Sequence, residues 1–140
     1  MRKQRGVTLL ELLLVISILL ILGTTSFTVG SGFLIRNALR TTTQELASNL
    51  RLAQLNSIAS KEDRQWGVDV TSSEIRLFAV GDSSYDIVYD LPGSVSVNIG
   101  NVVFDNLTGN PNSTITFTLT SNIGDSNTIS VNELGIVDVN

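Results

Sequence analysis

The residue best placed to do chemistry in this sequence is Glu11, a carboxylate inside a run over residues 7–22 that is otherwise aliphatic except for Thr8 and Ser17. Placing a lone carboxylate at the centre of a bilayer costs about 2.5–3.5 kcal/mol on insertion scales. A cation at the same depth recovers much of such a cost. Glu11 therefore needs a functional explanation that a plain hydrophobic anchor does not supply.

A second group of candidates is Asp82, Asp86 and Asp90, which repeat every four residues. On one strand all three would share a face, and in loops two of them could gather a Ca²⁺ ion. The spacing lacks the alternating carboxylates and the glycine of an EF-hand loop. We therefore interpret them as solvated acidic side chains on an exposed face. No cofactor is expected, and a structural calcium ion is the one alternative. No other metal site is predicted.

The chain contains no histidine and no cysteine. The commonest general base, the commonest metal ligand and all thiolate chemistry are therefore missing. Serines are abundant, but no histidine exists to activate one, and Lys61 has no evident partner in the sequence. We predict that the protein is not an enzyme.

Basic residues gather at the N-terminus, where Arg2, Lys3 and Arg5 precede the aliphatic run. This arrangement is a positive-inside signal, which holds the start of the chain in the cytoplasm and places the rest outside it. Without these three residues the formal charge falls from −4 to −7. Such an acidic body does not favour a nucleic-acid partner.

The N-terminal part of the chain reads as one long helix over residues 7–60. Residues 7–29 are almost entirely apolar, and as a helix they would span about 35 Å, enough to cross a hydrocarbon core. Residues 30–60 are amphipathic: Ile35, Leu39, Leu46, Leu50 and Ala53 form one stripe at helical spacing, and Leu52, Leu55 and Ala59 form a second.

Residues 61–140 change to a period of two. Eight short segments rich in Val, Ile, Thr and aromatic residues alternate with turn sequences such as "GDSS" and "TGNPNS". Connections this short favour antiparallel pairing. The predicted fold is α+β, with an antiparallel β domain packed on the far half of the helix. We expect Trp66, Phe78, Phe104 and Phe117 in its core.

Three interpretations of the N-terminus remain open from these observations. A secretory signal peptide would be cut among the small residues 23–26 and lost. A signal anchor would keep the helix but leave Glu11 unexplained. The third is a processed leader: "KQRGVTLLE" resembles the leader junction of type IV pilins and type II secretion pseudopilins.

The resemblance implies a leader of residues 1–6, cut by the prepilin peptidase between Gly6 and Val7. The same enzyme then methylates the new amine of Val7, and Glu11 becomes the fifth residue of the mature chain. In this family the fifth-position carboxylate pairs with the N-terminal amine of a neighbouring subunit in the filament. Glu11 would then be a device for assembly. Three departures are Val7 in place of the usual phenylalanine, Thr28 in place of a helix-kinking proline, and the absence of the paired cysteines found in many pilin C-terminal regions.

The remaining chain resembles the H-type minor pseudopilins and FimT/FimU-like minor pilins (the GspH/FimT group). The segments "ELASNLRLAQLNSIASKEDRQWGVDV", "VVFDNLTGNPNSTITFTL" and "NTISVNELGIVDV" carry this resemblance. DNA-binding members have arginines after the glycine before the last strand. Here Gly135 is followed by Ile136, Val137 and Asp138, so we expect no nucleic-acid partner.

The resemblance implies a minor pseudopilin, a subunit of a type II secretion pseudopilus that supports protein export. One alternative is a minor type IV pilin that primes pilus assembly or DNA uptake, and another is a membrane-anchored extracytoplasmic binding domain. The expected partners are other pilins or pseudopilins, the prepilin peptidase, the assembly platform of the inner membrane and membrane lipid. The expected location is the inner membrane, crossed once, and the filament after assembly.

Overall fold

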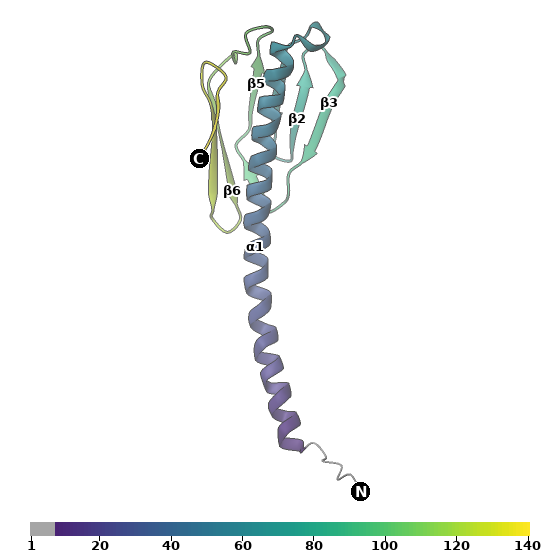
Figure 1. Ribbon diagram of the computed structural model, residues 1–140, viewed down its shortest axis with the longest axis vertical. Helices are drawn as coiled ribbons and strands as arrows, with labels where there is room; N and C mark the ends of the chain where they lie inside the picture. The colour runs from purple at the N-terminus through teal and green to yellow at the C-terminus, as the bar shows by residue number, and fades with distance from the viewer. Residues whose placement is uncertain (1–7) are drawn as a thin grey trace. The chain divides into compact units, whose positions relative to one another are not determined.

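The computed structural model describes residues 8–140, apart from the side chains of residues 24–31. A single α-helix, α1, extends from Leu9 to Ile58 (Figure 1). The helix predicted over residues 7–60 is therefore confirmed to within two residues at its C-terminal end. Thr28 lies within this one helix.

All eight predicted strands are present, but they form two sheets instead of one. The elements are the short 3-10 helix η1 (Lys61–Asp63) and the strands β1 (Trp66–Val70), β2 (Glu74–Ala79), β3 (Asp82–Asp90), β4 (Val95–Val97), β5 (Gly100–Phe104), β6 (Ile115–Ser121), β7 (Ser126–Val131) and β8 (Val137–Val139). The first sheet has the strand order β3-β2-β1-β5, and the second has the order β4-β6-β7-β8. The strand pairs in both sheets are antiparallel, as predicted.

The chain divides into two compact units between Leu34 and Ile35. The second unit contains the helix from Ile35 onward together with every strand. Within this unit the helix lies against the sheets (Figure 1). The α+β fold is therefore confirmed.

The first predicted stripe of the helix forms part of the core. Leu39, Leu46, Leu50 and Ala53 are at most 4% exposed, and they belong to one cluster with the apolar side chains of both sheets. Ile35, the remaining member of the stripe, is only half-buried. Burial of one face in this way is the main source of stability for an amphipathic helix.

The second stripe behaves differently. Leu52, Leu55 and Ala59 stay exposed because the sheets cover only the opposite side of the helix. Among the aromatic residues, Trp66, Phe104 and Phe117 are buried as expected. The prediction for Phe78 is wrong: it is only half-buried, and its ring packs 5.4 Å from the Arg76 guanidinium.

Candidate functional site

Glu11 lies in the first turn of α1. The residue before the helix, Thr8, caps it, since its Oγ1 accepts a hydrogen bond from the Glu11 backbone N–H at 3.2 Å. Thr-x-x-Glu is the spacing of a capping box, and a carboxylate in a first turn also interacts favourably with the helix dipole. The sequence analysis missed this role of Thr8, although the spacing itself could have revealed it.

Most side chains near Glu11 along the helix are aliphatic and exposed. The large aliphatic side chains from Leu9 to Leu22 are between 48% and 83% exposed. An apolar surface of this extent is removed from water by lipid or by other protein chains. Within residues 8–140, apart from the side chains of 24–31, no helix is both long and apolar enough to cross a membrane. The span proposed for residues 7–29 stays a prediction.

The predicted processing site lies outside the described residues. This applies to the basic residues Arg2, Lys3 and Arg5 and to the cleavage pair Gly6 and Val7. Their roles therefore stay predictions from the sequence.

Two glycines let loops of the β domain approach the helix. Gln54 Nε2 donates hydrogen bonds to the carbonyl oxygens of Gly109 at 3.1 Å and Leu134 at 3.4 Å. Gly109 and Gly135 both have positive φ angles, 69° and 76°. A Cβ atom on Gly109 would lie 2.6 Å from Ile58 Cγ1, and one on Gly135 would collide with the Gln54 amide. The glycine before the last strand is therefore required for contact with the helix.

Ser57 joins the last turns of α1 to the first sheet. Its hydroxyl oxygen accepts the backbone N–H of Trp66 at 2.8 Å, and its carbonyl oxygen accepts the N–H of Leu107 at 3.1 Å. Ser57 is completely buried. This hydroxyl therefore has a structural role.

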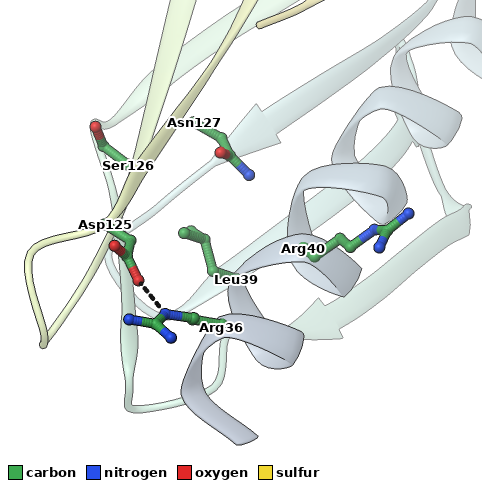
Figure 2. A pocket seen from close by; sticks show the side chains of 6 residues that line it. All are labelled: Arg36, Leu39, Arg40, Asp125, Ser126 and Asn127. Atoms are coloured by element: carbon green, nitrogen blue, oxygen red, sulfur yellow. Dashed lines mark hydrogen bonds and ion pairs between the residues drawn. The ribbon is translucent and has the colours of Figure 1, made fainter. Parts of the chain in front are cut away.

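An open hollow of about 520 Å³ lies beside the helix near its entry into the β domain (Figure 2). Arg36 Nε contacts Asp125 Oδ2 at 3.1 Å, and Asn127 Nδ2 donates to Thr43 Oγ1 at 3.1 Å. The Arg36 and Asp125 side chains are 70% and 45% exposed, so the ion pair contributes little to stability. Arg40 lines the same hollow and makes no ion pair within the described part of the chain.

The three aspartates considered as weak metal candidates have different partners. Asp82 contacts Arg64 at 3.5 Å, Asp86 contacts Arg76 at 3.3 Å, and Asp90 is exposed. All three belong to β3, but the pairing of β3 with β2 shifts register opposite Leu77–Ala79, so the simple alternation of faces is broken. Asp90 and Asp82 remain solvated, with 35% of the Asp82 side chain exposed, whereas the Asp86 side chain is only 15% exposed beside Arg76.

The same region shows no built metal centre. In the part of the chain that is described, no three acidic residues lie close enough together to hold a metal ion. The pKa of Asp82 is lowered, mainly by a hydrogen bond from the Ser84 side chain and next by one from the Ser84 backbone N–H. The positive charge of Arg64 adds to the effect.

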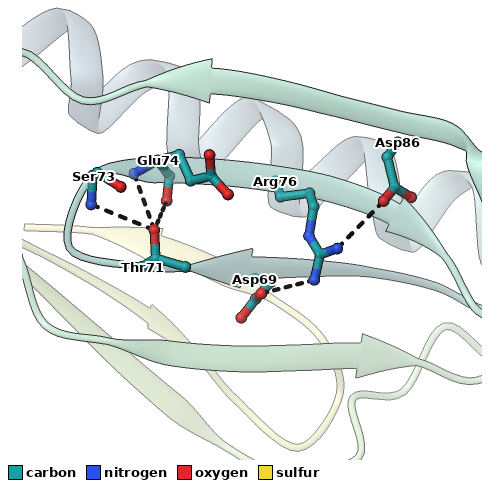
Figure 3. Close-up of polar contacts among 6 residues, drawn as sticks. All are labelled: Asp69, Thr71, Ser73, Glu74, Arg76 and Asp86. Carbon is teal, nitrogen blue, oxygen red and sulfur yellow. Dashed lines mark hydrogen bonds and ion pairs between the residues drawn. The ribbon is translucent and has the colours of Figure 1, made fainter.

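Arg76 is held between two carboxylates on the outer face of the first sheet (Figure 3). Its guanidinium contacts Asp69 at 3.0 Å and Asp86 at 3.3 Å. The hydrogen bond to Asp69 is the main cause that raises the pKa of Arg76. Arg64 is likewise paired with Asp82. Each of these two arginines is therefore balanced by at least one carboxylate, which weakens its attraction for a phosphate backbone.

Comparison with known protein families identifies one motif in this chain. Residues 1–27 match the family described as the prokaryotic N-terminal methylation motif. No significant match was found among curated proteins or among solved structures. The chain is therefore type IV pilin-like at its N-terminus, where it carries a prepilin-type methylation motif.

Proposed function

We propose that this chain is a minor pseudopilin, a structural subunit of a type II secretion pseudopilus that supports protein export. The observation that carries the proposal is the exposed aliphatic helix with a single carboxylate in its first turn. A methylation motif covers the same residues. A β domain docked on the other half of the helix supplies the outer surface of such a subunit.

The mechanism rests on charge compensation between subunits. Cleavage after Gly6 frees the amine of Val7, four residues before Glu11, and the peptidase then methylates this amine. Within an apolar filament core, Glu11 of one subunit is stabilised when it meets the amine of its neighbour. A contact between two different patches of identical or related subunits propagates as a helical filament when the rotation between subunits does not close into a ring.

The partners follow from this mechanism. The prepilin peptidase processes the chain, and the inner membrane stores it with its N-terminus in the cytoplasm. The assembly platform then adds it to other pseudopilins. Pairing of Arg64 and Arg76 with aspartates favours protein export over a role in DNA uptake, because it removes the basic patch that DNA would need. Assembly of a type IV pilus is the second candidate.

The proposal is tested with Glu11→Gln, which keeps the size of the side chain and removes its charge. We expect normal membrane insertion and processing but strongly reduced incorporation into sheared filaments, together with reduced export of a secreted protein. Ser17→Ala is the matched control, since Ser17 lies on the same helix and its hydroxyl donates to the Leu13 carbonyl. Incorporation of Glu11→Gln equal to that of Ser17→Ala would contradict the proposal, and loss of pili with intact export would favour the pilus alternative.

A further inference from the structure

The strand β3 forms an open edge of the first sheet. It is the last strand in the order β3-β2-β1-β5, and it pairs with β2 alone. With nine residues it is also the longest strand in the described part of the chain. The free side of an edge strand presents unpaired N–H and C=O groups that can pair with another chain.

The hydrogen-bond pattern identifies which residues of β3 face that open side. The Leu91 N–H donates to the Ser73 carbonyl at 2.8 Å, just beyond the end of β3. In an antiparallel pair, hydrogen-bonded positions alternate along each strand. The backbone groups of Tyr89 and Ile87 therefore face β2, and those of Val88 and Asp90 point to the open side.

A groove of about 300 Å³ runs beside this edge, between α1 and β3. Leu52, Tyr85 and Ile87 are among its lining residues. Ile87 pairs with the buried Leu77, so its side chain lies on the core face of the sheet, yet it is 45% exposed. The core face of the sheet is therefore partly exposed at β3, where the helix does not cover it. A further strand along β3 would place every second side chain into this groove.

The outer face of the same edge carries an uncompensated pair of like charges. Glu74 on β2 lies directly opposite Asp90 on β3, an arrangement that destabilises a sheet. Within the described residues, neither carboxylate makes an ion pair. Two residues further along β2 the charges are compensated, because Arg76 contacts both Asp69 and Asp86 (Figure 3).

We propose that the open edge of β3 binds an extended segment of another protein, which joins the sheet as an antiparallel strand. The segment carries a lysine or arginine opposite Asp90 and apolar residues opposite Val88 and Ile87. The basic side chain offsets the Glu74–Asp90 repulsion, and the apolar residue opposite Ile87 covers the groove. The apolar residue opposite Val88 packs against Val88 on the outer face of the sheet, where Val88 lies beside Arg76. This surface belongs to the single subunit, so the inference goes beyond filament assembly and does not depend on it.

The test uses the full chain, ¹⁵N-labelled in detergent micelles, and the acetylated peptide SKTVITS. In antiparallel pairing, its lysine can lie opposite Asp90 and its valine and isoleucine opposite Val88 and Ile87. We expect chemical-shift changes and slowed hydrogen exchange at the Val88 and Asp90 amides. The peptide SETVITS should bind at least about threefold more weakly, as expected for exchanging one exposed attraction for a repulsion.

A charge-reversal variant separates recognition from folding, because it should reverse the preference between the two peptides, whereas a misfolded variant would bind neither. Asp90→Lys should reverse the preference, so that SETVITS binds more tightly, whereas Asp138→Lys on β8 should leave it unchanged. Val88→Pro removes an outward N–H without touching the pairing to β2 and should abolish binding. Absence of shifts at β3, or an unchanged preference in Asp90→Lys, would overturn the proposal. Protection of the same amides that rises with protein concentration, without peptide, would assign the edge to a second copy and also overturn it.

Discussion

Ser57→Ala is expected to weaken the attachment of α1 to the first sheet. The substitution removes the oxygen that accepts the Trp66 N–H at 2.8 Å, and both residues are buried. A buried donor left without a partner costs roughly 1–3 kcal/mol. Alanine has a higher helix propensity than serine, which returns a few tenths of a kcal/mol or more. The expected net loss is therefore about 1–2 kcal/mol.

For a unit of about one hundred residues, that loss corresponds to a fall in melting temperature of roughly 4–12 °C. The assay is thermal unfolding of the full chain in detergent, followed by near-ultraviolet circular dichroism, which reports the packing of Trp66. Ser48→Ala is the matched control, because Ser48 lies on the same helix and is exposed. It should melt at or slightly above the temperature of the parent protein.

Equal melting temperatures for Ser57→Ala and Ser48→Ala would refute this reasoning. They would mean that the hydroxyl of Ser57 does not hold the helix to β1. A lower midpoint without loss of the cooperative transition would instead confirm that the helix from Ile35 onward and the sheets unfold together.

Three further substitutions probe other contacts, each by thermal or chemical unfolding. Leu50→Ala should destabilise the second unit by about 2–5 kcal/mol, because Leu50 is completely buried. Gly135→Ala should also destabilise it, by at least about 1 kcal/mol, since φ is 76° and a Cβ atom would collide with Gln54. The lowered pKa of Asp82 stabilises the fold above pH 3.8, and this small contribution is lost as the pH falls further; Asp82→Asn should remove that pH dependence.

The sequence predicts local structure in this chain well. The segment "EIRLFA" has a period of two in the sequence, and in the structure it forms β2, where buried and half-buried side chains alternate. Turn residues separate such segments clearly. The helix is equally clear, because no proline interrupts residues 8–91 and the first apolar stripe is continuous. These features depend on neighbours in the chain, which a sequence displays directly.

The division into two sheets was not predicted. It depends on which strands pair: β1 pairs with β5 across a long separation in sequence, and β4 pairs with β6. Strand alternation shows which side chains share a face but says nothing about the partner strand. The prediction of a single sheet was therefore wrong.

The ion-pair partners of the acidic residues likewise could not be predicted from the sequence. A spacing of four along one strand suggests a common face for Asp82 and Asp86. The irregular register of β3 and the positions of Arg64 and Arg76 on other segments decide their actual environment. By contrast, the role of Thr8 as the helix cap is local and could have been read from its spacing to Glu11.

The central claim is that the acid near the start of α1 exists to meet a newly made amine on another subunit. Mass spectrometry of the N-terminal peptide, taken from membranes and sheared filaments of the native host, tests its prerequisite most directly. We expect a chain that begins with N-methylated Val7. An intact Met1, or a chain that starts near Thr25, would contradict it.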